Sequence, residues 1–424
     1  MIASLLMVDS LQQSAFIVSQ GEEILTGQTI DTNANFLCDR LTRIGFRVRG
    51  VITAGDHIEE IAGALRLASE RAQAVVCTGG LGPTDDDHTA QAAALAFDQQ
   101  LSFYPDAMEQ VAQRFVAAGR ELAQSDRRQA ILPEGCQLIE NLLGTAPGFS
   151  LKHGEQGRCW FLPGVPSEMK AMWRQQVEPE AAALLQTPAP LRLVFRTLGK
   201  GESKLQDMLG DLPERFPAVN LGFRAHMPEN QIKLVADATE QQQLNEAADI
   251  VRQRLGKDLF SESEDIGLAE SVGKLLLTRG ERIALAESCT GGLIGHMCVS
   301  VPGSSGWLER GFVTYSNAAK IELLGVSETT LKSHGAVSEE TAIEMATGAL
   351  NAASTEWGIA VTGIAGPGGG SVAKPVGSTC IAVCGPSGTR VRSFKLRRDR
   401  NSNRLRAASL ALDMLRRQLL RAGQ

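Results

Sequence analysis

The stretch R-I-A-L-A-E-S-C-T-G-G, Arg282–Gly292, is the most informative part of this chain. Its apolar first half ends abruptly in small polar residues and a glycine pair. The apolar residues that follow recur at roughly helical spacing: Leu293, Ile294, Met297 and Val301. This pattern predicts a buried strand, a tight turn and the start of a helix. The turn carries two candidate nucleophiles, Ser288 and Cys289, and its glycines and the first N–H groups of the helix favour a bound anion.

The sequence offers two candidate nucleophiles at this turn and more than one candidate base to activate them. Cys289 has the higher intrinsic reactivity, but adjacent turn residues point in different directions, so only one of Ser288 and Cys289 can face a ligand. His296, on the following helix, is one candidate base. Tyr315 and Lys320, about one helical turn apart, form another. A lysine base requires burial, because lowering its pKa from ~10.4 toward neutrality costs roughly 4–5 kcal/mol. The alternative interpretation of Lys320 is a solvated residue at a helix start with no catalytic role.

The rest of the C-terminal part alternates between strands and helices. Apolar runs predict strands at Phe312–Tyr315 and Glu356–Thr362, and the second ends in the glycine-rich loop G-I-A-G-P-G-G-G. Amphipathic spacing predicts helices at Leu268–Arg279 and Asn401–Arg421. The basic stretch Lys395–Arg406 is interpreted as a solvated helix start with a few anion contacts.

The N-terminal part has the same alternation. Its expected elements are strands at Ala15–Ser19, Arg47–Ala54 and Ala74–Thr78 and helices at Ala34–Ile44 and Ile58–Arg71. The short, wholly apolar third strand is typical of a parallel sheet that is buried on both faces. The order predicts a doubly wound α/β domain, whose ligands lie beyond the C-terminal ends of the strands.

The loop Gly79–Thr89, G-G-L-G-P-T-D-D-D-H-T, follows the third of these strands. Its adjacent carboxylates, Asp85–Asp87, are explained either by a favourable position at a helix N-terminus or by a hard cation such as Mg²⁺ that bridges them to a phosphate. The loops Gly144–Phe149 and Pro163–Met169 also follow apolar stretches. Three such loops predict one shared cleft.

The middle of the chain is a small α+β unit. Pro179–Pro190 is rich in alanine and proline and predicts a domain boundary. Strands at Leu191–Leu198 and Gln231–Asp237 and a helix at Gln241–Leu255 follow it. The sequence G-K-G-E lacks the basic flanks of a G-x-x-G nucleic-acid clamp, so a spacer or dimerisation role is favoured over RNA binding.

Composition limits the classes of partner. The 424 residues carry a net charge of −6, with 43% hydrophobic and 21% charged residues, as in ordinary soluble multidomain proteins. This balance predicts no nucleic-acid partner, and the absence of a long apolar run predicts no membrane partner. The eight cysteines form no CxxC pair, so free thiols in a reducing cytoplasm are expected.

Several motifs together resemble the CinA family. In the C-terminal part these are A-E-S-C-T-G-G, G-F-V-T-Y-S-N-A-A-K, G-A-V-S, T-G-I-A-G-P-G-G and K-P-V-G, and in the N-terminal part they are the three loops above with G-Q-T-I-D-T-N. The resemblance implies an α/β chain of three parts. These are a doubly wound MoaB/MogA-like domain at 14–180, a KH-like α+β connector at 181–262, and a C-terminal α/β deamidase domain of PncC type at 263–424.

The resemblance implies that the C-terminal domain hydrolyses the carboxamide of nicotinamide mononucleotide, releasing ammonia and nicotinate mononucleotide without a cofactor. Ser288 would attack the amide, with Tyr315 and Lys320 relaying its proton. The backbone at Thr290, Gly291 and Gly292 would stabilise the oxyanion or bind phosphate. The expected ribose-phosphate contacts are Thr362, Gly363 and an arginine of the tail, Arg400 or Arg404.

For the N-terminal domain the resemblance implies cleavage of the diphosphate of ADP-ribose with a divalent metal. Asp86 and Asp87 match the acidic pair that would hold Mg²⁺, Mn²⁺ or Co²⁺, with K⁺ as an additional candidate ion. The expected phosphate loop comprises Gly79, Gly80, Gly82, Thr84 and Asn33. Three residues depart from the family pattern, namely Gln20, Glu22 and Asp85, and an added carboxylate near a diphosphate would weaken its binding.

Two other classes of function remain open. One is a non-enzymatic molybdopterin-binding module, which co-purified pterin fluorescence would support. The other is an interaction protein of competence or DNA damage, for which the acidic balance and the lack of aromatic–basic interleaving argue against direct DNA contact. The resemblance also implies a homodimer.

Overall fold

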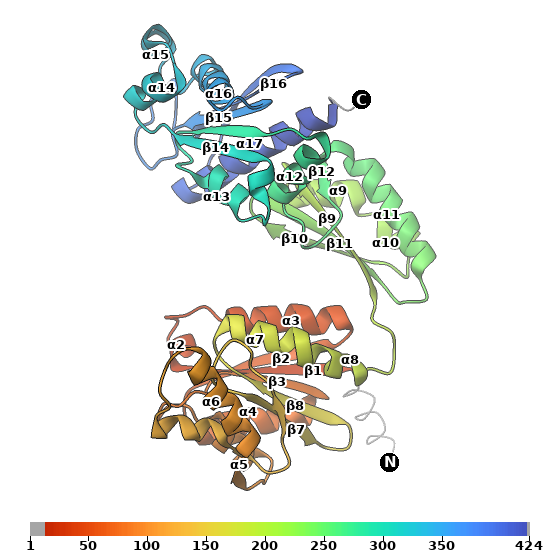
Figure 1. Cartoon of the computed structure of the whole chain (residues 1–424). Coiled ribbons are helices and arrows are strands. Elements are labelled where there is room, and N and C mark those ends of the chain that lie inside the picture. Colours follow the sequence, from red (N-terminus) through yellow and green to blue (C-terminus); the bar gives the residue numbers. More distant parts are fainter. Residues whose placement is uncertain (1–12, 422–424) are drawn as a thin grey trace. The chain divides into compact units, whose positions relative to one another are not determined.

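The computed structural model describes residues 13–421, and the chain divides into two compact units, Met1–Pro190 and Leu191–Gln424 (Figure 1). No helix within residues 13–421 is long and apolar enough to cross a bilayer.

The first unit is built on a six-stranded sheet in the order β2-β1-β3-β8-β7-β6. Strands β2, β1, β3 and β8 are parallel, whereas β7 and β6 run antiparallel to their neighbours. The strands are β1 (Ser14–Gln20), β2 (Arg47–Ala54), β3 (Ala74–Thr78), β6 (Gln137–Ile139), β7 (Gly148–His153) and β8 (Gly157–Leu162), with β4 (Leu101–Phe103) and β5 (Ile131–Pro133) forming a separate pair.

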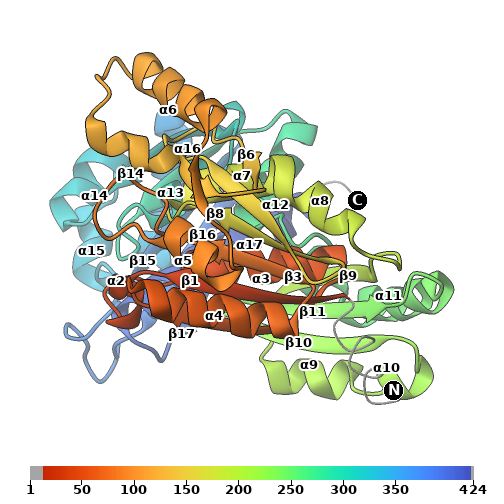
Figure 2. The same ribbon diagram turned by 90° about the horizontal axis from the view of Figure 1, so that it is seen from below.

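Helices cover both faces of this sheet. Alternate residues of β1 belong to different cores, because Phe16 and Val18 pack in one apolar cluster and Ala15 and Ile17 in the other. Figure 1 shows α3, α7 and α8 on one face and α4 and α5 on the other, and Figure 2 shows α4 lying across β1. The main helices are α2 (Glu22–Leu25), α3 (Thr32–Ile44), α4 (Ile58–Arg71), α5 (Thr89–Ala96), α6 (Pro105–Ala117), α7 (Pro166–Met172) and α8 (Glu178–Ala183).

The second unit begins with a four-stranded antiparallel sheet in the order β10-β11-β9-β12. Its helices bury one face of the sheet through an apolar cluster that includes Phe195, Ile232, Leu244 and Val251. The elements are β9 (Leu191–Leu198), α9 (Glu202–Leu209), α10 (Leu212–Arg215), β10 (Asn220–His226), β11 (Glu229–Ala236), α11 (Gln241–Leu255) and β12 (Leu259–Ser261).

A five-stranded sheet in the order β14-β13-β15-β16-β17 follows in the same unit, with β14, β13 and β15 parallel and β16 and β17 antiparallel. The strands are β13 (Ile283–Glu287), β14 (Leu308–Val313), β15 (Trp357–Gly363), β16 (Ser378–Gly385) and β17 (Gly388–Lys395). The helices are α12 (Leu268–Arg279), α13 (Leu293–Val299), α14 (Asn317–Leu324), α15 (Glu328–His334), α16 (Glu339–Ala353) and α17 (Arg400–Arg421).

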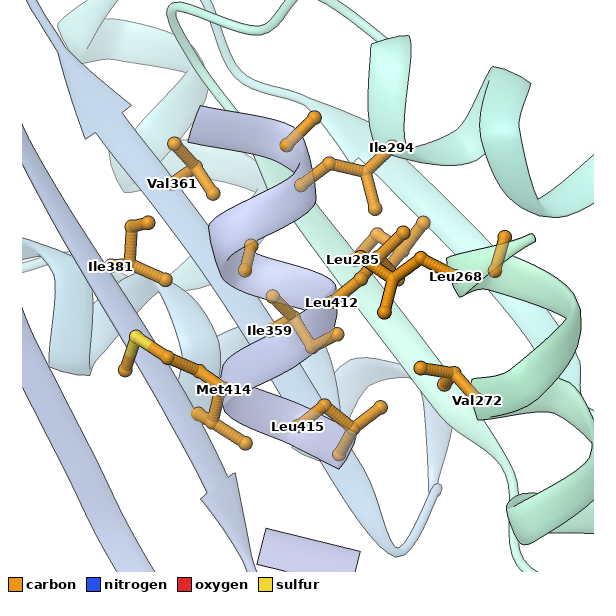
Figure 3. Close-up of a cluster of buried hydrophobic side chains, with 14 of the residues drawn as sticks. Leu268, Val272, Leu285, Ile294, Ile359, Val361, Ile381, Leu412, Met414 and Leu415 are labelled. Atoms are coloured by element: carbon orange, nitrogen blue, oxygen red, sulfur yellow. The ribbon is translucent and has the colours of Figure 1, made fainter. Parts of the chain in front are cut away.

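The two faces of this sheet have different cores. Ile283 and Leu285 of β13 pack with α12 and α17, where Leu268, Leu412 and Leu415 also converge (Figure 3). On the opposite face, Ala284 and Ala286 pack against α16. Because these side chains are small, α16 lies very close to the sheet. A Cβ atom on Gly358 of β15 would meet the carbonyl oxygen of Ala346 at 2.2 Å.

We therefore expect Gly358→Ala to lower the free energy of unfolding by about 3 kcal/mol, because a rigid helix backbone blocks the added methyl group. Gly368→Ala is the matched control, since no heavy atom lies within 4 Å of its Cβ position. Denaturant unfolding of the full chain, followed by tryptophan fluorescence, measures both variants. Equal midpoints for the two would contradict the close approach of α16.

The sequence-based assignment of elements is largely confirmed. Arg47–Ala54, Ile58–Arg71, Ala74–Thr78, Leu191–Leu198, Gln241–Leu255 and Leu268–Arg279 were predicted with the observed bounds. Two assignments were wrong in part. Strand β14 ends at Val313, before Tyr315, and Lys395 ends strand β17 instead of opening a helix. Strand β17 was missed because it is an exposed edge strand whose polar and basic residues show no apolar alternation.

Candidate active site

The turn after β13 has the predicted strand–turn–helix form. The N–H of Ser288 donates to the carbonyl oxygen of Val361 (2.9 Å) and so extends the pairing between β13 and β15 by one residue. Gly291 and Gly292 then adopt φ values of +59° and +88°. These left-handed conformations are accessible to glycine without strain, which explains the glycine pair between the strand and α13.

Glu287, a residue that sequence reasoning missed, occupies the start of α13. Its buried carboxylate accepts hydrogen bonds from the N–H groups of Ile294 (3.0 Å) and Gly295 (2.8 Å). These helix N–H groups are therefore not open to a substrate phosphate. Among the described residues, the N–H groups of Cys289, Thr290 and Gly292 make no hydrogen bond within the protein. Cys289 and Thr290 are buried and Gly292 is half-buried, so the N–H of Gly292 is the most accessible of these candidate donors for an oxyanion.

Lys320 lies beside Ser288. It projects from α14, whose first turn is capped by Ser316, and only 1% of the residue is exposed. Its Nζ atom is 3.2 Å from Ser288 Oγ, 2.8 Å from the carbonyl oxygen of Thr314 and 3.5 Å from that of Ser316. The structure thus brings together two of the three residues expected to carry out the reaction.

Lys320 Nζ has three hydrogen-bond partners, because it donates to the carbonyl oxygens of Thr314 and Ser316 and to Ser288 Oγ. Three acceptors match the three N–H groups of an ammonium. Within residues 13–421 no carboxylate forms an ion pair with Lys320, and burial lowers the pKa of its amine. Loss of one proton would leave the lone pair facing the Ser288 hydroxyl, which is the arrangement of a base beside a hydroxyl nucleophile.

Cys289 and His296 are the alternatives that the geometry does not support. Cys289 is 7% exposed and packs in the core with α12 and α17, and burial raises the pKa of its thiol to about 12. A protonated thiol inside a core is a poor nucleophile. His296 is exposed on α13 and, among the described residues, makes no side-chain hydrogen bond to Ser288.

Tyr315 does not join Ser288 and Lys320. It is 63% exposed, and its hydroxyl accepts a hydrogen bond from Arg400 Nη2 (3.1 Å). Among the described residues it bonds neither of the other two. The expected convergence of all three side chains is therefore only partly realised, because Tyr315 lies beyond the end of β14, where no sheet pairing directs it inward.

The two tail arginines have different partners. Arg404 donates from Nε (3.3 Å) and Nη2 (2.9 Å) to the carbonyl oxygen of Thr290, so it holds the turn itself. Arg400 donates to the carbonyl oxygen of Gly366 (2.6 Å) and to Tyr315. Arg400 is exposed, whereas Arg404 is half-buried. Of the two, Arg400 is the one at the surface, where a phosphate is accessible.

Thr362 and Gly363 shape the wall next to the turn. The hydroxyl of Thr362 donates to the carbonyl oxygen of Ala336 (2.6 Å), and the residue is fully buried. A Cβ atom on Gly363 would lie 3.0 Å from Cys289 Sγ. Both residues are engaged in packing, so the direct ribose contacts expected of them stay predictions.

In the first unit, the loops after the strands meet as predicted. Asn33 of α3 donates from Nδ2 to the carbonyl oxygen of Gly164 (2.7 Å) and to Thr78 (3.1 Å). Its Oδ1 atom is buried without a hydrogen-bond partner. Gly79 and Gly80 have φ values of +112° and +63°, and a Cβ atom on Gly79 would lie 2.6 Å from the carbonyl oxygen of Gln20. These contacts bring together Asn33 and the loops Gly79–Thr89 and Pro163–Met169. The third predicted loop meets the latter, because a Cβ atom on Gly144 would lie 2.0 Å from the carboxylate of Glu168.

The acidic residues of loop Gly79–Thr89 have separate roles. Asp87 accepts hydrogen bonds from the N–H (2.8 Å) and the hydroxyl (2.6 Å) of Thr84, and a Cβ atom on Gly82 would lie 2.5 Å from its carboxylate. Asp85 pairs with Arg128 at the surface. The nearby Thr84 side chain lowers the pKa of the exposed Asp86. Only part of the triplet is therefore free to bind a cation.

Comparison with known proteins identifies the family. Three family models match in succession, "Probable molybdopterin binding domain" over residues 16–183, "Damage-inducible protein CinA KH domain" over 192–261 and "CinA C-terminal domain" over 265–419. A CinA-like protein of Citrifermentans bemidjiense is 42% identical over 95% of this chain and 97% of its own length. The chain belongs to the CinA family.

A second CinA-like relative agrees with this assignment, and one solved structure matches part of the chain. A CinA-like protein of Desulforapulum autotrophicum is 40% identical over 96% of this chain and 98% of its own. The crystal structure of competence/damage inducible protein CihA from Agrobacterium tumefaciens is 41% identical, covers 37% of this chain and 99% of that chain, and has a TM-score of 0.35. The predicted family and the predicted mixed α/β fold class are thus confirmed.

Two residues of this CinA chain that differ from the family pattern, Gln20 and Glu22, lie at the N-terminal site. Gln20 donates from Nε2 to Asp56 (3.2 Å) and bonds the hydroxyl of Thr89, and the N–H of Glu22 also donates to Asp56 (3.3 Å). Both residues therefore help to hold the loops together. No group of three or more His, Cys, Asp or Glu side chains in the described part of the chain is arranged to hold a metal ion alone.

Proposed function

We propose that the CinA C-terminal domain is an amidohydrolase that converts nicotinamide mononucleotide to nicotinate mononucleotide and ammonia. One observation carries this proposal. A serine hydroxyl at a strand–helix turn lies 3.2 Å from a buried lysine amine whose N–H groups are held by backbone carbonyl oxygens. Such a pair is suited to acyl transfer.

In the proposed reaction, the lone pair of Lys320 accepts the hydroxyl proton as Ser288 Oγ forms a bond to the carboxamide carbon. The N–H groups of Thr290 and Gly292 donate to the resulting oxyanion. The Lys320 ammonium returns its proton to the leaving nitrogen, and the C–N bond breaks to release ammonia. A water molecule, deprotonated by Lys320, then cleaves the acyl-serine ester and regenerates the hydroxyl.

Arg400 and Tyr315 are proposed to bind the polar end of the substrate. Their side chains are joined by a hydrogen bond at the surface of the domain. A guanidinium is suited to bidentate phosphate recognition, and the adjacent phenol adds a donor. This placement supports a nucleotide substrate over free nicotinamide, and proton relay through Tyr315 stays a resemblance-based prediction.

The test is product identification. Purified chain is incubated with nicotinamide mononucleotide, and ammonia and nicotinate mononucleotide are quantified together. Stoichiometric appearance of both supports the proposal. Release of free nicotinamide instead would mean cleavage of the glycosidic bond, and the proposed reaction would be wrong.

The pH profile provides a second expected result. Because the amine must be neutral to act as a base, kcat/KM should rise with pH through the lowered pKa of Lys320 and level off above it. The rising limb should lie below the ordinary lysine pKa of about 10.4. A profile that falls with pH over the same range would contradict a neutral amine base.

A second activity is proposed for the N-terminal site, namely metal-dependent cleavage of the diphosphate of ADP-ribose. The buried, unpartnered Asn33 Oδ1 and the Gly79–Gly80 backbone favour a polar ligand beside these loops. Asp86 and the free oxygen of Asp87 fit Mg²⁺, which is commonly held by one or two carboxylates and completed by water and phosphate. When bound, such an ion would supply charge neutralisation at the diphosphate.

We expect EDTA to suppress cleavage of ADP-ribose and to leave deamidation unchanged, because the Ser288–Lys320 pair uses no metal ligand. Both rates are measured on one preparation before and after chelation, and Mg²⁺ is then restored as the control. Equal loss of both activities would place a required metal in the deamidase site and contradict this assignment.

A further inference from the structure

One cavity of the unit Leu191–Gln424 is separate from the Ser288 site. Its volume is ≈ 610 Å³. It lies between the end of β9, the strand β17 with the turn after it, and helix α17. Arg404, which contacts the active-site turn, and Arg400, which bonds Tyr315, do not line it. The cavity is therefore distinct from the proposed deamidase site.

The cavity has a strong excess of positive charge. Two acidic residues line it, Asp258 and Asp413, and both are neutralised. Asp258 pairs with Lys200 (2.9 Å) and Arg417 (3.0 Å), and Asp413 pairs with Arg417 (2.6 Å) and the buried Arg416 (2.7 Å). Within residues 13–421, five further cationic side chains of the lining have no acidic partner: Arg392, Lys395, Arg397, Arg398 and Arg406.

The backbone that carries these cations is held in place. The N–H of Leu396 donates to the carbonyl oxygen of Gly377 (2.9 Å), and Arg398 exchanges hydrogen bonds with the buried Asn403 through its N–H (3.2 Å) and its carbonyl oxygen (2.7 Å). On the other side of the cavity, Arg416 of α17 donates to the carbonyl oxygens of Lys257 (2.6 Å) and Leu259 (3.2 Å) and so holds α17 to the segment that leads into β12. The cations are thus carried by an ordered backbone around one cavity without an acidic partner, an arrangement that an anionic ligand would stabilise.

The rest of the lining favours an organic ligand. Leu198, Leu396, Leu410 and Met414 provide apolar surface. Phe394 is half-buried, and the guanidinium of Arg392 lies 5.4 Å from its ring centroid. An aromatic ring and an arginine plane are common stacking partners of a nucleobase. The volume is within the range of small-molecule sites and is suited to one nucleotide.

We propose that this cavity binds a nucleoside di- or polyphosphate, with the phosphates against the unpaired cations and the base near Phe394. A long nucleic acid is less well matched, because the lining is a cavity with a single aromatic residue and the chain as a whole carries a net charge of −6. This inference does not depend on the proposed deamidase activity, because it is tested by binding alone.

The test measures binding of ADP, AMP and adenosine to the full chain by calorimetry, with EDTA present to suppress the metal-dependent N-terminal site. ADP should bind most tightly and adenosine most weakly, and added NaCl should weaken ADP binding. Absence of ADP binding at millimolar concentration would overturn the proposal.

Variants locate the site. We expect Arg392→Gln combined with Arg397→Gln to weaken ADP binding roughly tenfold for each lost cation. Arg390→Gln is the matched control, since Arg390 lies on the same strand and face as Arg392 but outside the cavity, and its ADP affinity should be unchanged. Unchanged affinity in the double variant would place ADP elsewhere and overturn the proposal. Displacement of ADP by a single-stranded oligonucleotide that binds more tightly would assign the cations to nucleic acid and would also overturn it.

Discussion

Ser288→Ala should lower ammonia release from nicotinamide mononucleotide by at least about 10⁴-fold, because removal of the attacking hydroxyl leaves only binding and oxyanion stabilisation. The fold should be retained. The hydrogen bond from the backbone N–H of residue 288 to Val361 does not involve the lost hydroxyl, and the side chain's contact is with Lys320. Ammonia release is measured with a coupled assay, and folding by the unfolding midpoint.

Cys289→Ala is the matched control for this variant. It removes the neighbouring candidate nucleophile, which is buried in the core and whose thiol pKa is raised to about 12. We expect it to retain activity near that of the unmodified chain, with a modest loss of stability from the small cavity. The opposite pattern, activity retained in Ser288→Ala and lost in Cys289→Ala, would make the nucleophile assignment wrong.

Lys320→Met should reduce deamidation by roughly 10²–10⁴-fold, the usual contribution of a positioned general base. Methionine has a similar length and no titratable group, so it fills the buried site without accepting a proton. The rising limb of the pH profile should disappear together with the activity. Lys332→Met is the control, because Lys332 is an exposed lysine on α15 that pairs only with Glu328 among the described residues (3.1 Å). Full activity in Lys320→Met would contradict the assignment of the base.

The same variant tests the protonation state through stability. Burial lowers the pKa of Lys320 in the folded state, whereas the unfolded chain keeps a value of about 10.4. Between these two pKa values the unfolded state binds the extra proton, so the stability of the unmodified chain rises with pH. Lys320→Met lacks this dependence. The free energy of unfolding of the unmodified chain, minus that of the variant, should therefore increase from neutral pH to about pH 10. A constant difference would mean that the lysine pKa is not lowered.

The elements that periodicity predicted well are those with buried, uninterrupted apolar patterns. Ala74–Thr78 and Leu268–Arg279 are examples, because a two-sided sheet and an amphipathic helix each impose a regular pattern on the residues that must be buried. Strand β17 was not predicted. It is paired through its backbone to β16, and that pairing requires no particular side chains.

The sequence by itself determined the family, the mixed α/β fold and the strand–turn–helix at Arg282–Gly292, because motifs and apolar spacing are local properties. Residue type and spacing left Ser288 and Cys289 as alternatives, and the family resemblance favoured Ser288. The tertiary structure adds a physical reason for that choice, since a contact of 3.2 Å between Ser288 and Lys320 and the burial of Cys289 against α17 depend on residues far away in the chain. The tertiary structure also shows that N–H groups at the start of α13 donate to Glu287. Cationic side chains from β17, the turn after it and α17 line one cavity. Spacing along a chain does not predict such contacts, because they arise only when distant elements pack together.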